Sequence, residues 1–152
     1  MSEVNLVAAD HWSIGEAAQV CYDLTTLAYP TGAPWQLATF QTDLASAHTN
    51  YVFAVIADNV VGFVSYTTLF DEAEVTNVAV HPDFQRRGIA TQLLQHVFQT
   101  LTVPAKVFLE VRQSNLAAQQ LYQRCGFTTM TVRKGYYQAT GEDALIMRKM
   151  IE

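Results

Sequence analysis

The segment HPDFQRRGIATQLLQ, residues 81–95, decides the fold of this chain. It leads from a polar turn through two arginines and Gly88 into a helix. The helix is predicted by a stripe of apolar residues at spacings of four and five, formed by Ile89, Leu93, Leu94, Val97, Phe98 and Leu101. We expect this helix to begin near Gly88 and to end before Pro104.

The start of this helix is suited to binding an anion. The first turn of a helix leaves backbone N–H groups without partners, and the helix dipole adds positive potential. Phosphate oxygens are natural acceptors for these groups. Gly88 has no side chain to hold a phosphate away from the backbone, and Arg86 and Arg87 add positive charge. The alternative is an ordinary helix start with a solvated basic pair.

The other elements predict an α/β protein of one domain spanning residues 1–152. Neither of the glycine-rich nucleotide-binding patterns, GxxxxGK[ST] or GxGxxG, is present. Asp58-Asn59 and Asp71-Glu72 mark turns of a strand meander. We expect helices over residues 10–28, 35–48 and 115–125, and strands over residues 51–57, 60–69, 74–80, 106–111, 128–133 and 142–147.

Composition excludes several classes of function. The net charge of −5 argues against a nucleic-acid partner. The first residues lack the pattern of a signal peptide, and no apolar stretch reaches the length of a membrane span, so we expect a cytoplasmic protein without membrane contact. The two cysteines are expected to be packing residues, and the histidines lack zinc-ligand spacing, so we expect no metal site. A monomer or a weak homodimer is expected.

Three segments together resemble one superfamily. They are NVAVHPDFQRRGIATQLLQHV (77–97), LEVRQSNLAAQQLYQRCGF (109–127) and RKGYYQATGEDALIMRKM (133–150). They are similar to the GCN5-related N-acetyltransferases (GNAT), and within them to the bacterial ribosomal-protein-alanine N-acetyltransferases of the RimI type. The resemblance covers about residues 50–150. It departs from the common pattern at Ala90, where the family often has a second glycine.

The resemblance implies a mixed, mostly antiparallel sheet that is splayed between its fourth and fifth strands, counting an N-terminal edge strand. Acetyl-CoA would lie in that gap. The backbone of Val78, Ala79 and Val80 would pair with the pantetheine arm of the coenzyme. The remaining coenzyme contacts would come from Arg86, Arg87, Gly88, Ile89, Ala90 and Thr91 at the pyrophosphate, and from Asn115.

The resemblance also implies catalytic roles for Glu110 and Tyr122. Transfer of an acetyl group to an amine needs a base for the amine proton and an acid for the departing thiolate. By similarity, Glu110 is the base, directly or through a water, and Tyr122 is the acid. A phenol with an ordinary pKa near 10 stays protonated at neutral pH and can donate. The alternatives are a solvated carboxylate and a core aromatic residue.

The acceptor groove is expected between two loops, 29–35 and the connection of the last two strands. Trp35, Tyr136 and Tyr137 are the candidate acceptor-binding residues; otherwise they cover the core. We expect a protein N-terminal amine as acceptor, plausibly the N-terminal alanine of a ribosomal protein, because an α-amine loses its proton more readily than lysine. The rival functions are acetylation of a small-molecule amine and a non-catalytic CoA-binding module.

Overall fold

The computed structural model describes residues 3–29 and 35–152. In these residues seven strands form one sheet in the order β1-β2-β3-β4-β5-β7-β6. Among these strands only the β4–β5 pair is parallel, so the sheet is mixed and mostly antiparallel, as predicted. The strands are β1 (Asn5–Ala8), β2 (Thr49–Ile56), β3 (Asn59–Leu69), β4 (Glu72–Val80), β5 (Ala105–Arg112), β6 (Thr128–Tyr137) and β7 (Glu142–Ile151).

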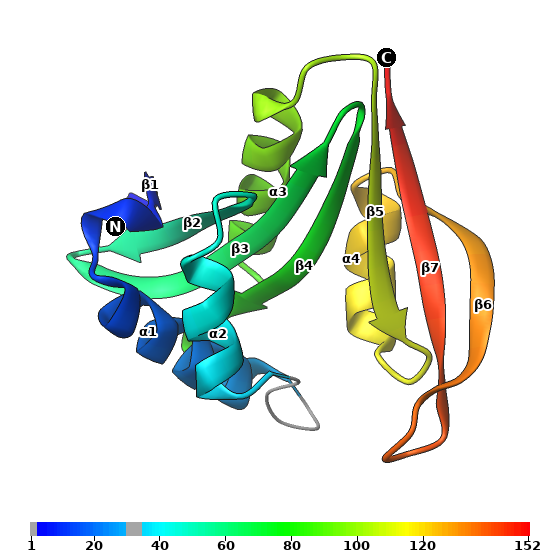
Figure 1. Cartoon of the computed structure of the whole chain (residues 1–152), viewed down its shortest axis with the longest axis horizontal. Helices are drawn as coiled ribbons and strands as arrows, with labels where there is room; N and C mark the ends of the chain where they lie inside the picture. Colours follow the sequence, from blue (N-terminus) through cyan, green and yellow to red (C-terminus); the bar gives the residue numbers. More distant parts are fainter. Residues whose placement is uncertain (1–2, 30–34) are drawn as a thin grey trace.

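Helices cover both faces of the sheet (Figure 1). In the described part of the chain the α-helices are α1 (Ile14–Ala28), α2 (Leu37–Leu44), α3 (Ile89–Thr100) and α4 (Leu116–Arg124), with short 3-10 helices at Ala9–His11 and Pro82–Phe84. One apolar core lies under α3 and α4, and a second lies between α1, α2 and the strands β2 to β4. No helix in residues 3–29 and 35–152 is both long and apolar enough to cross a membrane.

The predicted apolar stripe forms the buried side of α3. Ile89, Leu93, Leu94 and Val97 are each no more than 2% exposed. Every second residue of β5 is buried, and Val107, Leu109 and Val111 pack in the same core as α3. The core therefore fixes both the axis of α3 and which residues of β5 face away from it.

Several predicted boundaries were wrong. Helix α1 starts at Ile14 instead of residue 10, because Ser13 caps it by accepting a hydrogen bond from the Glu16 amide. The β2–β3 turn lies one residue earlier than predicted, with positive φ at Ala57 and Asp58. Helix α2 is shorter than predicted, at Leu37–Leu44, and the last two strands are longer.

The longer β6 changes the place of two candidate residues. Tyr136 and Tyr137 were expected in the loop between the last two strands, but they are the last residues of β6. The loop follows them, and Glu142 pairs with Tyr137 where β7 begins. Both tyrosines are therefore held by the end of a strand pair.

A β-bulge interrupts β4. Ser65 of β3 pairs with Asn77, whereas the next residue, Tyr66, pairs with Val75. Thr76 is thus the extra residue on β4. Bulges bend a strand and increase its twist, and they are frequent beside active sites.

The sheet opens at this bulge. Strand β4 pairs with β5 only up to Val75 and Leu109. Beyond these residues the two strands diverge toward their C-terminal ends (Figure 1). The predicted splay between the fourth and fifth strands is confirmed, and the bulge lies directly after the last β4 residue that pairs with β5. We call the region between the diverging backbones of β4 and β5 the opening.

Candidate active site

The backbone of β4 beyond the bulge faces the opening at alternate residues. The Val78 carbonyl accepts a hydrogen bond from the Tyr29 hydroxyl at 3.1 Å, and the Val80 carbonyl accepts one from the Gln85 side-chain amide at 3.0 Å. Both carbonyls therefore point away from β3. Ala79 has the opposite orientation, toward β3, because neighbouring residues of a strand alternate in direction. Of these three candidate residues, only Val78 and Val80 direct backbone groups into the opening.

The N-terminus of α3 has the features expected of an anion site. Its cap is Gly88, with φ of 79° and no side-chain hydrogen bond. The amides of the next residues, Ile89 to Thr91, therefore have no capping side chain. Arg86 also has a positive φ, 64°. A turn with residues of this conformation gathers N–H groups into a concave surface that suits an anion.

The two arginines before this cap differ in their contacts. The Arg87 guanidinium donates to the Asp83 carbonyl at 3.3 Å and lies 5.1 Å from the centre of the Phe84 ring. Arg86 is exposed and takes part in no ion pair with the described residues. Arg86 is therefore the freer of the two cations beside the α3 N-terminus.

Replacing Gly88 by alanine tests this anion site. An alanine in the left-handed region costs about 1–2 kcal/mol of stability. Its Cβ would meet no atom of the protein within 4 Å, so the protein itself has room for it. We expect the KM for acetyl-CoA, the donor that the sequence resemblance implies, to rise at least about tenfold, roughly the loss of one charge-assisted contact, because the methyl group occupies the space expected for phosphate.

Gly141 provides a matched control for the backbone strain. It has a φ of 72°, and a Cβ there also meets nothing within 4 Å. Gly141→Ala should therefore lower the thermal unfolding temperature by a similar amount and leave the KM for acetyl-CoA unchanged. An equal change of KM in both variants would show that strain alone, without any loss of an anion contact, explains the result.

Three tyrosine side chains meet in the opening. They are Tyr29 at the end of α1, Tyr122 on α4 and Tyr137 at the end of β6. Burial, together with smaller contributions from the neighbouring Cys125 and Tyr137, raises the pKa of Tyr122 to about 12. Burial also raises the pKa of Tyr29, with contributions from Tyr122 and Tyr137. All three phenols are therefore protonated at neutral pH.

The Tyr122 hydroxyl is not used to hold the fold together. The side chain is buried, and its ring packs against Phe127 with 5.9 Å between ring centres. Its hydroxyl makes no hydrogen bond to any residue that the structure describes. A hydroxyl without a protein partner is available to a ligand.

Glu110 lies on the other face of the sheet, away from α4. Its Oε1 is 3.9 Å from Nη1 of Arg133. A hydrogen bond to the Glu110 carboxylate and its negative charge raise the pKa of Tyr136. Burial and the charge of Glu110 raise the pKa of Glu74 on the neighbouring strand. Two carboxylates and the one guanidinium of Arg133 thus leave a net negative charge on this side of the opening.

Tyr137 links the two sides of the opening. Burial and then the Glu110 charge raise its pKa, and Tyr137 in turn contributes to the raised pKa of Tyr122. The Arg112 guanidinium lies 3.9 Å from the centre of the Tyr137 ring and is paired with Glu142 at 3.3 Å. The carboxylate of Glu110 and the phenol of Tyr122 therefore approach one opening from opposite faces, with Tyr137 between them.

Two other candidate residues have structural contacts as well. Asn115 caps α4, and its Oδ1 accepts a hydrogen bond from the Ala118 amide at 3.2 Å. A contact between Asn115 and the coenzyme would therefore use its Nδ2. Trp35 packs on Phe40 with 5.1 Å between ring centres, in the core beneath α1 and α2. Residues 30–34 of the predicted acceptor loop lie outside the described residues.

Two further polar residues lie at the opening: Tyr29, which the sequence analysis placed only as the first residue of the predicted acceptor loop, and Asn77, which was not a candidate. Asn77 is 3% exposed, and its Oδ1 is 3.4 Å from the Tyr29 hydroxyl. Its Nδ2 has no partner among the described residues. No local pattern could have identified Asn77, because only the bulge turns its side chain to the face of Glu110.

These features define the class of protein. A sheet split between two parallel strands, with an anion-binding helix start on one face and a carboxylate and a phenol around the opening, is suited to group transfer from an anionic donor. The comparison with known proteins names the family. The model of the acetyltransferase (GNAT) family matches residues 16–127. The chain therefore belongs to the GNAT family of acetyltransferases, as the sequence segments predicted.

Two relatives and one solved structure that are similar to the chain carry related names. The chain is 41% identical over 118 residues to the [ribosomal protein bS18]-alanine N-acetyltransferase of Salmonella typhimurium, covering 75% of this chain and 79% of the relative. It is 36% identical over 136 residues to the N-alpha-acetyltransferase RimI of Mycobacterium tuberculosis, covering 87% and 85%. The crystal structure of the ribosomal-protein-S18-alanine N-acetyltransferase from Escherichia coli superposes with a TM-score of 0.82 at 29% identity, covering 99% of this chain and 95% of that one.

Proposed function

We propose that this protein transfers an acetyl group from acetyl-CoA to the N-terminal α-amine of a protein, and that the natural acceptor is the N-terminal alanine of ribosomal protein bS18. The observation that carries the proposal is the placement of Glu110 and Tyr122 on opposite sides of one opening. The substrate follows from the similarity to enzymes that bear this name. With a ribosomal protein as acceptor, the site of action is the cytoplasm.

Acetyl-CoA supplies the acetyl group as a thioester. The amides of residues 88–91 hold its diphosphate, with Arg86 and Arg87 at the rim. The pantetheine arm passes through the opening beside Val78 and Val80, whose backbone points there, and Asn115 contributes its Nδ2. The residues present fit such a ligand, since the α3 cap has no side chain over it and a Cβ at Gly88 would stand in open space.

The chemistry divides between the two sides of the opening. Glu110 accepts the proton of the acceptor amine, directly or through a water, as the amine attacks the thioester carbonyl. A backbone N–H of β4, at Val78 or Val80, donates to the oxygen on which negative charge develops. Tyr122 donates its proton to the departing sulfur. General acid and base groups of this kind each contribute typically about 10²–10⁴ to the rate.

The charges around Glu110 favour an α-amine as the acceptor. Glu74 and Glu110 give this side a negative potential that attracts a positively charged N-terminus. At pH 7 about one α-amine in ten is neutral, but fewer than about one lysine in a thousand. A single carboxylate is therefore a sufficient base for an α-amine. Tyr136 and Tyr137 at the end of β6 form the wall of the acceptor groove nearest to Glu110.

The dependence of the rate on pH should follow from these groups. We expect kcat/KM for a peptide acceptor to rise with pH up to about 8, as the α-amine loses its proton. We expect no fall between about pH 8 and 10, because Tyr122, with its pKa raised to about 12, keeps its proton there. Stopped assays from pH 6 to 10 would measure this. A decline centred near pH 9 would exclude Tyr122 as the acid.

The acceptor is tested with a peptide that copies the first residues of bS18 and begins with alanine. Purified protein, acetyl-CoA and peptide should give an acetylated peptide by mass spectrometry and stoichiometric free thiol. The same peptide with a blocked N-terminus is the matched control and should not react. Thiol release with polyamines or amino acids but with no peptide would favour a small-molecule enzyme, and coenzyme binding without any release would favour a binding module.

A further inference from the structure

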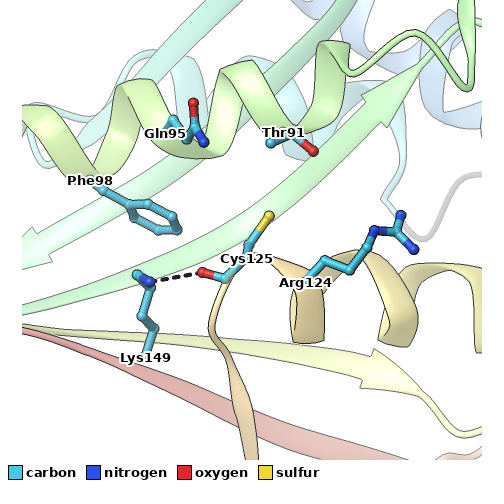
Figure 2. A pocket seen from close by; sticks show the side chains of 6 residues that line it. All are labelled: Thr91, Gln95, Phe98, Arg124, Cys125 and Lys149. Atoms are coloured by element: carbon cyan, nitrogen blue, oxygen red, sulfur yellow. Dashed lines mark hydrogen bonds between the residues drawn. The ribbon is translucent and has the colours of Figure 1, made fainter.

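The mechanism makes no use of the surface around the β3–β4 turn. A cavity of about 340 Å³, lined in part by Thr91, Arg124 and Lys149, borders the proposed diphosphate site and so lies on the donor side (Figure 2). Another cavity, of about 170 Å³, lies between the β3–β4 turn and the connection from α3 to β5. Its lining includes Phe70 and Glu72, and none of its residues has a role in the proposed chemistry.

Phe70 is an outlier in both conformation and exposure. It is 98% exposed and has a φ of 55°. Leu69 pairs with Glu72, so Phe70 and Asp71 are the two residues of the turn. Turns of this length favour Gly, Asn or Asp where φ is positive, and a bulky residue there costs stability. Since neither its conformation nor its exposure stabilises the fold, Phe70 indicates a function for the turn.

Phe70 belongs to an exposed apolar surface on a rigid base. Leu69 beside it is 68% exposed, and Val103, in the connection from α3 to β5, is 53% exposed. We call these three residues the turn surface. The Asp71 carbonyl accepts a hydrogen bond from the Lys106 amide at 2.8 Å, which fixes the turn against the start of β5 (Figure 1). Exposed apolar patches with polar residues around them mark protein-binding surfaces.

Carboxylates lead from the turn surface to the acceptor side of the opening. Asp71 and Glu72 are exposed at the turn, and Glu74 follows on the face of β4 that is turned away from the α3 core, the face of Glu110. None of the first three takes part in an ion pair with the described residues. Lys106 is the register neighbour of Glu72, so three carboxylates stand against one ammonium group.

These charges favour one kind of partner. The chain has a net charge of −5, so a second copy would be repelled from a surface that is itself negative. A basic protein would be attracted to it. Aromatic residues at the centre of such contacts supply much of the binding energy, with charged residues around them.

The spacing along the strands fits an extended chain that starts at the opening. Glu72 pairs with Lys106, and Glu110 lies four residues (110 − 106) further along β5. At about 3.3 Å per residue this separation is roughly 13 Å. A polypeptide with its N-terminus at Glu110 that runs back along β4 therefore reaches Glu72 within about four residues and Phe70 within about six.

We propose that the turn surface docks the body of the acceptor protein, and that this acceptor is a basic protein with an apolar site for Phe70. The proposal rests on the proposed function, which places the acceptor N-terminus at Glu110. Asp71, Glu72 and Glu74 attract the positively charged segment between that N-terminus and the docked part. A contact so far from the reacting groups selects a whole protein over a short peptide without changing the chemistry.

The test compares full-length bS18 with a peptide of about its first four residues, which is too short to reach Phe70. Phe70→Asn removes the ring and relieves the turn, because asparagine tolerates the left-handed region. Calorimetry without acetyl-CoA should show about tenfold weaker binding of full-length bS18, as for the loss of an aromatic anchor. The KM for full-length bS18 should rise by the same factor. The KM for the short peptide should stay unchanged, and the unfolding temperature should not fall.

Two further variants separate the apolar and the charged contributions. Met130→Asn is the matched control, because Met130 is 45% exposed on β6 outside the turn surface, and it should leave both acceptors unchanged. Glu72→Lys should weaken the binding of full-length bS18 but not of the short peptide. Its effect should be larger at low than at high salt, since exposed charges are screened by salt.

Equal affinity of the wild type and Phe70→Asn for full-length bS18, or no binding by the wild type, would overturn the docking proposal. An equal rise of KM for the short peptide would also overturn it, because a change at the opening would then explain the result. The short peptide tests the proposed function separately. If the peptide is acetylated and Phe70→Asn has no effect on the protein, docking alone is refuted. If bS18 binds through Phe70 but neither acceptor is acetylated, the proposed function alone is refuted.

Discussion

Replacing Tyr122 with phenylalanine should lower kcat by about 10²–10⁴, the usual contribution of a general acid, while the Kd for acetyl-CoA changes by less than about twofold. The phenylalanine ring keeps the packing against Phe127. The hydroxyl makes no hydrogen bond to a described residue, so its removal leaves no protein group without a partner. Turnover measured with the bS18 peptide, together with calorimetry for acetyl-CoA, separates the two quantities.

Tyr66→Phe is a suitable control for the loss of a buried phenol. The Tyr66 hydroxyl is 3.1 Å from that of Thr100, and the side chain lies in the same core but away from the opening. Its loss should lower stability by about 0.5–1.5 kcal/mol and leave kcat unchanged. If Tyr122→Phe instead resembled this control, with reduced stability and normal turnover, Tyr122 would be a core residue only.

The parts of the fold that depend on local patterns could be predicted from the sequence. Ile89 to Val97 repeat with the period of a helix, and the stripe alone fixes the buried side of α3. The connection from β4 to α3 ends at Gly88, which caps α3 in the left-handed conformation. Only glycine adopts this conformation at low cost. Each of these features is decided by residues within one or two turns of each other, and such features are visible in the sequence.

The features that depend on pairing with distant residues could not be predicted in this way. The bulge at Thr76 exists because Ser65 pairs with Asn77 while Tyr66 pairs with Val75, and nothing within β4 itself indicates the shift. The bulge turns Asn77 to the face of Glu110. If the side chains of β4 had alternated strictly from Val75 onward, the Asn77 side chain would have lain in the core beneath α3.

The tyrosines of the opening illustrate the same limit. Tyr29 ends α1 and reaches the Val78 carbonyl, 49 residues further along the chain. Tyr137 owes its position to the pairing of β6 with β7. The family resemblance identified Tyr122 and Glu110 as candidate catalytic residues. The contact between Tyr29 and β4 could not be found in this way, because it depends on how α1 packs on the sheet.

The two carboxylates on the acceptor side are not equivalent. Glu74 lies on β4 before the bulge, where β4 and β5 are still paired. Burial and the charge of Glu110 raise the pKa of Glu74, so Glu74 takes up a proton at a higher pH than an ordinary glutamate. Glu110 follows Leu109, the last β5 residue paired with β4, so it stands at the start of the opening. We therefore propose Glu110 as the base and both carboxylates as the groups that attract the ammonium group.

Glu110→Gln should accordingly lower kcat by about 10²–10³ near pH 7, since a neutral amide of the same shape cannot accept the amine proton. The deficit should narrow above about pH 8, where the peptide α-amine has already lost its proton and needs less help from a base. Glu74→Gln, the matched control, removes the same charge from the same face, so it should mainly raise the KM for the peptide. A larger fall of kcat in Glu74→Gln than in Glu110→Gln would transfer the role of base to Glu74. A deficit in Glu110→Gln that stayed constant from pH 6 to 10 would mean that Glu110 orients the acceptor without accepting its proton.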